Sequence, residues 1–518
     1  MPNQHYEFHT PYASSLDTGA PTRADTDDST TGEVALNTVQ YTLGELDTKR
    51  SSYTDDVEHL SQIRTLFQGG RTIELQKRQY LKQRLDESSE EYSKRLERFV
   101  YTNTFGYAVQ RLLSKFATGE VHVTGYQTAQ EDDWATLRES VGVGDTGERL
   151  LLQDLLRDLI VDGSVWLRAD RPASPVAITN RAQERALGLT PYLVSYSPLE
   201  VLSSGPGWVK LRRFTLVAQP FGPSHYEATW ELLTEATTTT FSLDVLLNAQ
   251  GEIKSVVSSD GTTRPYSKSM VVPGYVVEHG FGRLPIVHVA LSPEAWAGNQ
   301  VRLKALQQLE IENALTDTAV SAGYVQRVLT PLDTTESLTE VAAEDYAPSS
   351  NANVYMAKSF NFAEIAGTSI TVVRELLATI ASEIRSAVQV TGASVDKGAL
   401  ERSAASKYAD REELSLALIG YGQIVTAAYQ SALQIIAPLL DTVPSDVAVT
   451  GLDTFELDNL SELLEVGEKL AGDALESRLS PRALHGFYQK LGNQLSHNST
   501  AAQRLEVETT TPVPTVAP

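Results

Sequence analysis

A chain of 518 residues with 41% hydrophobic side chains is too long for one ordinary core, so its length predicts two to four subdomains. It contains no cysteine, which excludes disulfides, thiolate metal sites and cysteine nucleophiles. Its formal net charge of -23 argues against a protein that grips DNA by neutralising phosphates, although an acidic wall can keep a moving duplex from sticking. We expect no membrane span, because no apolar run reaches roughly 18 residues. We also expect no signal peptide, because the N-terminal residues show no basic region followed by an apolar one.

The first part of the chain predicts an arm followed by helices. Residues 1–35 are rich in Thr, Ser, Asp and Pro without apolar periodicity, which predicts a flexible arm. Apolar residues then recur at helical spacing up to about Ala117, and Asp86 and Ser88 are expected to cap a helix. A further amphipathic helix, Glu148–Val161, is expected to stop at Gly163 and to be followed by a strand.

The region from about Pro191 to Leu291 predicts an antiparallel, hairpin-rich unit. Segments such as YLVSYS and VKLRRFTLVA carry β-branched and aromatic residues, and Pro and Gly separate them. The run Thr237–Thr240 is expected to pair within a strand or to lie at its end. His279 and His288 flank a predicted strand, and we expect both to be structural residues and not metal ligands.

The stretch from Val301 to Leu440 is the most informative part of the sequence. Its order suits a subunit that contributes a spoke and a lining segment to a ring, and suits a self-contained enzyme poorly. The order is a helix, an acidic insert, a returning helix, a small Gly/Ser/Lys loop and a very long apolar helix: Val301–Ala322, Val325–Phe362, Ser369–Val390, Thr391–Ser406 and Lys407–Ala437.

Apolar stripes predict how the returning helix and the long helix pack. The stripe of the returning helix should lie on the first helix; it consists of Val372, Leu376, Ile380, Ile384 and Val388. The long helix follows an alternating four-three step, the pattern of a coiled-coil-like seam: Leu414, Leu418, Tyr421, Val425, Ala428, Ala432 and Ile435. Leu416, Ile419 and Leu433 make its other faces apolar too, and Gly420 and Gly422 permit a bend or close packing. The pattern leaves open whether this helix is central to one domain or bridges neighbouring subunits.

Motifs that would indicate catalysis are weak. Gly142, Gly144 and Gly147 spell G-x-G-x-x-G, but an acidic helical segment precedes them where a dinucleotide site needs a buried strand, so we predict a simple loop before a helix. Ser394–Lys397 matches S-x-x-K without its companion K-T-G. The nine histidines include no H-E-x-x-H, and no Walker A pattern is present. We therefore expect no enzyme activity, no metal and no cofactor.

Several segments, in order over roughly Tyr80 to Leu491, resemble the portal proteins of tailed bacteriophages. QRLDESSEEYSKRLERFVYTNTFGYAVQRLLSKF looks like the family's Tyr/Arg helix followed by an Asn-bearing one. LLQDLLRDLIVDGSVWLRADRP is similar to its helix-Gly-strand segment, PYLVSYSPLEVLS to its Tyr-x-Pro turn, and GRLPIVHV to the strand that enters its first stem helix. KLAGDALESRLSPRALHGFYQKLG looks like its C-terminal segment, in which a Ser starts a helix.

The resemblance implies an α+β, mainly helical ring subunit with a hairpin-rich β-containing wing, two stem helices flanking a small α/β clip, a long buried helix and a small helical crown. By resemblance the boundaries are a flexible arm over 1–35, wing 36–296, stem helices 297–324 and 363–390, clip 325–362, channel loop 391–406, long wing helix 407–440, crown 441–495 and disordered tail 496–518. The region after Asp441 is short for this family, which puts a large crown in doubt.

The implied function is a portal, a ring-shaped channel at one capsid vertex through which double-stranded DNA is packaged by a terminase and later ejected. Implied partners are copies of itself in a homo-dodecamer, the terminase large subunit, head-completion adaptor and tail proteins, major capsid and scaffolding proteins, and DNA bound without sequence preference, with no membrane. The implied location is the virion, and the host cytoplasm during assembly. Alternatives are a structural ring or scaffold without DNA passage and, third, an enzyme.

Two sets of charged residues are candidate contacts. No Lys or Arg lies between Leu332 and Ala357, so the insert should form an acidic collar that docks a basic surface of the terminase or adaptor: Asp333, Glu336, Glu340, Glu344 and Asp345. In the loop, Lys397 and Arg402 are expected to touch DNA phosphates in the channel, or else to pair with Asp396 and Glu401.

Overall fold

The computed structural model describes residues 37–85, 87–144, 146–172, 189–218, 224–248, 251–258, 262–323, 326–330, 359–363, 367–388, 404–453 and 455, with positions 183 and 187 between them. The side chains of 321–369 and 404–413 lie outside this description. The chain divides into two units, Met1–Asp453 and Thr454–Pro518. Everything below concerns the first unit, which is α+β, as predicted. Among the described helices, none combines the length and apolar content needed to cross a bilayer.

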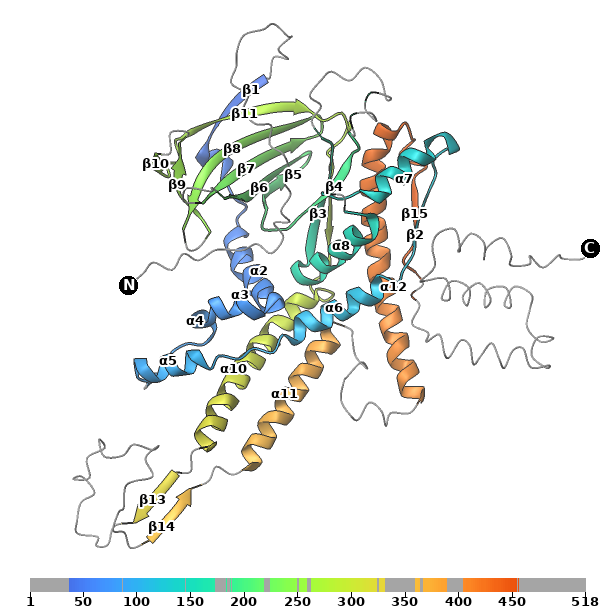
Figure 1. Cartoon of the computed structure of the whole chain (residues 1–518). Coiled ribbons are helices and arrows are strands. Elements are labelled where there is room, and N and C mark those ends of the chain that lie inside the picture. The colour runs from blue at the N-terminus through green and yellow to red at the C-terminus, as the bar shows by residue number, and fades with distance from the viewer. Residues whose placement is uncertain are drawn as a thin grey trace, which may run out of the picture. The chain divides into compact units, whose positions relative to one another are not determined.

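An eight-stranded antiparallel sheet forms the upper part of Figure 1. Its strand order is β1-β11-β8-β7-β6-β5, with β9 paired to β8 and β10 to β9. The run Thr237–Thr240 opens β8 and pairs with β11, which confirms its prediction as strand. The strands are β1 (Asn37–Thr42), β5 (Val201–Gly205), β6 (Trp208–Val217), β7 (His225–Thr234), β8 (Thr237–Leu247), β9 (Ile253–Val257), β10 (Thr263–Pro265) and β11 (Val271–Glu278).

Side-chain alternation gives this sheet two apolar faces. Trp230 and Phe241 are buried on one face, against α1 (Leu43–Leu46) and the start of α2 (Tyr53–Gln68). Leu211 and Leu233 are buried on the other, among residues of a second, three-stranded sheet. That sheet has the order β12-β3-β4 and comprises β3 (Ser164–Asp170), β4 (Tyr192–Tyr196) and β12 (Ile286–Ala290).

A buried ionic contact ties the two sheets together. Arg168 on β3 donates to the Glu231 carboxylate on β7 at 2.7 Å and to the Tyr196 hydroxyl at 3.2 Å. The Tyr196 hydroxyl in turn donates to Glu231 at 3.0 Å. The Arg168 side chain is only 4% exposed and also pairs with Asp170 of its own strand at 3.1 Å, so removing Glu231 would leave this buried charge with one of its two carboxylate partners.

Helices carry the chain between and below the sheets. The α6 helix buries one full face, including Phe105, Val109, Leu112 and Phe116. The helices of this part are α3 (Gly70–Leu75), α4 (Lys77–Tyr80), α5 (Ser89–Glu97), α6 (Thr104–Phe116), η1 (Thr128–Gln130), α7 (Glu131–Glu139) and α8 (Glu148–Asp162).

The stop of α8 at Gly163 is confirmed. Gly163 is in the left-handed region with φ 76, where its N–H donates to Leu159 O and ends the helix. A Cβ at this position would come within 2.6 Å of the Trp296 ring, so only glycine lets the indole approach. The turn from α8 into β3 therefore also sets the entrance to the next helix.

Two long helices leave the sheets side by side (Figure 1). They are α10 (Ala297–Gly323), which covers the predicted first helix, and α11 (Gly367–Ala387), which covers most of the returning one. At their far end β13 (Gln326–Thr330) pairs antiparallel with β14 (Ser359–Ala363). This strand pair is the described portion of the segment predicted as a clip.

The long helix α12 (Ala404–Ile436) confirms the four-three seam over its described side chains. Leu418, Tyr421, Val425 and Ile435 are buried, and the helix contacts α6, α8, β3 and β12. Leu416 was predicted to be covered and is 64% exposed instead. Position 416 lies off the seam, and no described element covers that side of the helix at this level.

Residues 441–453 belong with the first unit, although the predicted helical crown began at 441. After η5 (Ala437–Leu440) the chain forms β15 (Ala448–Gly451), which pairs antiparallel with β2 (Val121–Thr124). The backbone of Leu452 then passes against α12 at Gly422, where a Cβ would lie 2.0 Å from the Leu452 carbonyl oxygen. Of the two predicted roles for Gly422, close packing is the one observed. The remainder of the predicted crown and tail lies outside the described residues.

Replacing Gly422 with Ala should destabilise the protein, because the new methyl group would collide with the Leu452 backbone. We expect the free energy of unfolding to fall by on the order of 1–3 kcal/mol. Gly420→Ala is the matched control, since that position faces open space and alanine should stabilise the helix by about 0.5–1 kcal/mol. Denaturant unfolding followed by circular dichroism measures both, and equal effects of the two changes would contradict this packing.

Candidate functional site at the two-helix hairpin

An apolar seam and an ion pair hold the hairpin of α10 and α11 over its described side chains. Lys304 on α10 pairs with Glu383 on α11, which fixes the register of the two helices. Ile380 and Ile384 are buried on α11, which contacts α10 and α6, and Val388 is buried directly after its end. Val301, Ala305 and Leu309 are buried on α10. The buried part of the hairpin is therefore the half nearest the sheets.

The predicted stripe of α11 is correct in its second half and wrong in its first. Val372 is 63% exposed and Leu376 is 43% exposed. A constant step of four residues drifts by about 40° per step around a helix of 3.6 residues per turn. The observed seam compensates with a three-residue step, so that the half-buried Val373 and Leu377 continue the line of Ile380 and Ile384.

An extended segment ahead of α6 binds along α10 through three polar side chains. The buried Asn313 amide accepts a hydrogen bond from Val100 N at 3.1 Å and donates to Val100 O at 2.8 Å. Glu312 accepts from Thr102 N at 2.8 Å, and Gln308 donates to Thr102 O at 3.1 Å. The backbone of the segment is thus held by side chains of α10, which take the place of the neighbouring backbone that a strand would have.

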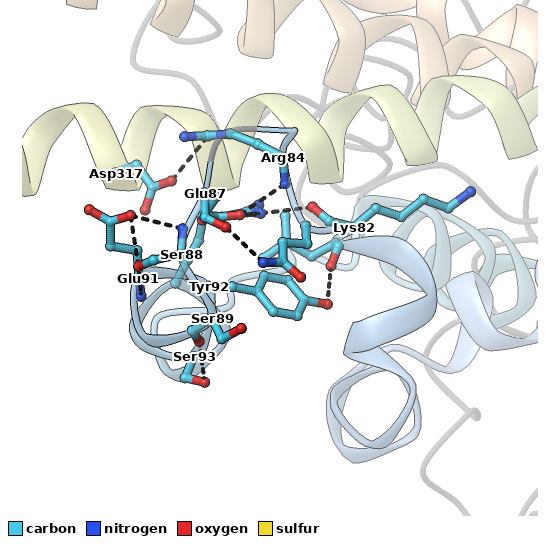
Figure 2. Close-up of polar contacts among 12 residues, drawn as sticks. Lys82, Arg84, Glu87, Ser88, Ser89, Glu91, Tyr92, Ser93 and Asp317 are labelled. Carbon is cyan, nitrogen blue, oxygen red and sulfur yellow. Dashed lines mark hydrogen bonds and ion pairs between the residues drawn. The ribbon is translucent and has the colours of Figure 1, made fainter.

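We call residues 81–103, ahead of α6, the lateral arm, or simply the arm below. A nearly buried ion pair organises its outer part, residues 81–98 (Figure 2). Arg95 donates to both oxygens of Glu87, at 2.7 and 2.6 Å, and to Lys82 O. These hydrogen bonds lower the pKa of Glu87 to about 2. Ser88 and Glu91 form a capping box at the start of α5, which confirms Ser88 as a cap, whereas Asp86 is outside the described residues.

One further contact joins the arm to the hairpin. Arg84 donates to Asp317 of α10 at 3.1 Å, and Figure 2 shows both side chains reaching across the gap between the two elements. Together with Asn313 and Gln308, it gives α10 a line of polar contacts to the arm over about three turns. Sequence reasoning missed these partners; the only local signal was the cap at Ser88, because the contacts join residues far apart in the chain.

A polar cavity of about 410 Å³ lies at the base of the hairpin. His59 meets Trp296 edge-on at 5.4 Å and contacts Asn299 at 3.0 Å, while Arg50 pairs with Asp56 at 2.8 Å. Asp162 is held by Arg64 at 2.6 Å. Arg50 and Asp56 thus pair within the lining, whereas the partner of Asp162 lies outside it, and no group of three His, Asp or Glu among the described residues is arranged to hold a metal ion.

The weak motifs are structural where they are described. Gly142 N donates to Thr146 O at 2.8 Å, so the Gly-rich segment is a closed loop between α7 and α8, as predicted. Phe281 N donates to His279 Nδ1, which leaves Nε2 as the donor to Thr234 O. His288 stacks on Trp166 at 4.1 Å. Both histidines are structural residues, as expected, and Ser394–Lys397 lies outside the described residues.

The structure brings none of the predicted contact residues together, because all of them lie outside the described residues. They remain predictions: Lys397, Arg402, Asp396 and Glu401 in the loop, and Asp333, Glu336, Glu340, Glu344 and Asp345 in the insert.

No protein-family model and no curated protein matches this sequence. Among solved structures, a chain from the neck of an empty GTA particle with C6 symmetry overlaps 74% of this chain and 90% of its own, at 13% identity and a TM-score of 0.36. A chain from the neck of a native GTA particle with C12 symmetry overlaps 73% and 87%, at 12% identity and a TM-score of 0.33. At TM-scores this low the overlaps carry no argument about the fold or the function of this chain.

The Glu87–Arg95 pair predicts how the arm responds to acid. Folding lowers the pKa of Glu87 from 4.5 to about 2. The pair therefore stabilises the fold fully above pH 4.5, and this stabilisation is lost as the pH falls from 4.5 to about 2. We expect hydrogen-exchange protection of residues 84–98, corrected for intrinsic exchange rates, to fall over that range. In Glu87→Gln the protection should be lower at neutral pH and nearly independent of pH. The same pH profile in both proteins would rule out this role for Glu87.

Proposed function

We propose that this chain is the subunit of a ring at a viral capsid vertex, through which double-stranded DNA passes during packaging and ejection. The observation that carries the proposal is the order of elements from α10 to α12, in which two long antiparallel helices leave the sheets and return. The segments that resemble bacteriophage portal proteins lie before and after this stretch, in the same sequence order as in that family. The chain would act without catalysis, metal or cofactor.

The hairpin suits a position between neighbouring subunits. Val372 and Leu376 on the outer part of α11 are exposed, and so is Leu303 near the start of α10, at 64%, although other residues of the half nearest the sheets are packed within the chain. Exposed apolar side chains of this size on long helices favour burial against another protein. In a ring, each hairpin would be flanked by the hairpins of two neighbours, which would cover these side chains.

The net charge of the chain favours DNA that passes along the protein over DNA that is tightly bound to it. A net charge of -23 per subunit repels phosphate, so a duplex would slide without tight binding. Lys397 and Arg402 in the predicted channel loop would then provide brief local contacts. The acidic insert, from Asp333 to Asp345, would lie at the tip of the hairpin and bind the basic surface of a packaging motor or of an adaptor.

Imaging of single particles of the purified protein tests the proposal first. We expect end-on views of a closed ring of about twelve subunits around a central hole. A compact monomer or dimer, both alone and after addition of the capsid and scaffolding proteins, would contradict the proposal. A closed ring that supports no DNA packaging would instead favour a purely structural ring or scaffold.

Two sets of variants in a packaging assay test the finer roles. Replacing the five acidic residues of the insert with Ser should lower affinity for the terminase and reduce packaging, because it removes the charge that attracts a basic partner. Replacing Lys397 and Arg402 with Ala should leave packaging possible and alter DNA retention. Both sets should assemble normally, and unchanged terminase affinity in the first set would refute the docking role.

A further inference from the structure

Residues 70–85 form a basic surface on an acidic chain. They contain five basic side chains and one acidic one, while the whole chain carries -23. Arg84 is bound to Asp317, but Arg71, Arg78 and Lys82 are exposed and form no ion pair with a described residue. These three positive charges therefore face solvent within the part of the chain that the structure describes.

The same surface carries exposed leucines. Leu85 is 100% exposed and Leu75 is 51% exposed, and both lie within seven residues of Arg78 in sequence. Exposed leucines interspersed with arginine are typical of protein interfaces, where burial of apolar area adds to charge attraction. We call this surface the basic ledge; it consists of Arg71, Leu75, Arg78, Lys82 and Leu85.

The basic ledge is held in place from beneath. Ile73 and Leu81 are buried, and the Tyr92 hydroxyl donates to Leu81 O at 2.8 Å. Arg95 donates to Lys82 O at 2.7 Å. A surface whose backbone is already ordered loses little conformational entropy on binding, which favours a docking role.

An acidic surface lies far from the basic ledge, around α7, at the opposite side of Figure 1 from α4 and α5. Glu131, Asp132 and Glu139 are exposed on α7 and form no ion pair with a described residue. The adjoining segment after η5 adds the exposed Asp446 and Val443, the latter 57% exposed. We call this surface the acidic corner; it consists of Glu131, Asp132, Glu139, Val443 and Asp446.

The acidic corner is also ordered. Trp134 of α7 is fully buried, and its indole N–H donates to Thr442 Oγ1 at 3.1 Å. Gln130 donates to Asp441 O at 2.6 Å. These contacts join α7 to the segment that carries Val443, so the two halves of the acidic corner form one surface.

We propose that the basic ledge of one subunit docks on the acidic corner of a second copy of this chain. The two surfaces match in charge and in exposed apolar character, and they lie too far apart to meet within one copy. A contact between two different surfaces of identical subunits is heterologous, so it propagates from copy to copy and closes into a ring when the rotation allows. This inference rests on the proposed ring and names one of its interfaces.

Nucleic acid is the less favoured occupant of the basic ledge. Phosphates would neutralise its charges but would leave Leu75 and Leu85 uncovered. The exposed Glu91 of α5 lies six residues after Leu85 in sequence and would repel a backbone of phosphates. An acidic protein surface with its own apolar residue satisfies both features of the ledge.

Charge reversal in the full-length chain tests the inference. The ledge variant carries Arg71→Glu, Arg78→Glu and Lys82→Glu, and the corner variant carries Glu131→Lys, Asp132→Lys and Glu139→Lys. The fraction assembled, measured by mass photometry at low salt, should be at least tenfold lower for each variant alone than for the unmodified chain. The reason is that charges of the same sign then face one another across the interface. An equimolar mixture should recover rings in which the two variants alternate, since each variant's ledge complements the other's corner.

The control variant makes the same change in net charge as the ledge variant, at exposed positions elsewhere. Lys254→Glu, Arg264→Glu and Lys268→Glu lie in and beside β9 and β10, and this variant should assemble like the unmodified chain. Recovery of rings in the mixture also shows that both variants are folded. Raising the salt from about 0.1 M to about 1 M should weaken assembly of the unmodified chain, because the screening length falls from about 10 Å to about 3 Å.

The outcomes separate the inference from the proposed function. Rings from the unmodified chain together with unimpaired rings from the ledge variant would overturn the inference alone. Failure of the mixture to recover would also overturn it. Normal assembly with reduced binding of a duplex DNA probe by the ledge variant would assign the ledge to nucleic acid. Absence of assembly by the unmodified chain, with and without capsid and scaffolding proteins, would contradict both.

Discussion

The buried amide of Asn313 joins the part of the chain that precedes α6 to the helix that begins the hairpin. The side chain is 3% exposed and satisfies both backbone groups of Val100 as well as Leu309 O. An apolar residue in its place would leave the Val100 N–H and C=O unpaired, at about 1–3 kcal/mol for each group. Because α6 follows directly and packs against α11, Asn313 helps to position both the hairpin and the arm, together with Gln308 and Glu312.

A second buried polar contact fixes the sheets above the hairpin. Arg168, Glu231 and Tyr196 connect β3, β4 and β7 within a core of aliphatic and aromatic residues between the two sheets. Such a contact contributes little net stability compared with an apolar filling of the same volume. Its effect is to select one pairing of the two sheets, because any shift of one sheet against the other would separate the buried Arg168 from Glu231. β12 pairs with β3 and leads through Trp296 into α10. The pairing of the two sheets therefore also positions the base of the hairpin.

These constraints leave the surfaces proposed to function on ordered supports. Tyr92 of the arm holds the basic ledge, and Asn313 of α10 holds the arm. Trp134 joins the two parts of the acidic corner. Charge attraction between such surfaces acts at a distance of about 10 Å at moderate salt and so favours rapid, reversible association. The exposed apolar residues, Leu85 and Val443 among them, would add the short-range part of the binding free energy. An acidic chain with one basic surface therefore has a physical reason to associate with itself in a defined direction.

The sequence by itself determined the elements whose signals are local. Ser88 predicted the start of α5, Gly163 the end of α8, and the four-three step the buried side of α12. Each depends on residues within a few positions of one another, so backbone geometry and periodicity are sufficient. The same reasoning failed for Val372 and Leu376, since periodicity shows which residues share a face but not how far the covering element extends.

Only the tertiary structure decided which distant segments meet. The pairing of β15 with β2, the clamp of Asn313 on Val100 and the approach of Leu452 to Gly422 leave no mark in the neighbouring residues. The sequence likewise showed an acidic chain, while the structure placed the basic ledge and the acidic corner on opposite sides of it. The reason is physical: a hydrogen bond or a charge is local in space and not in sequence, so its partner is known only once the chain has folded.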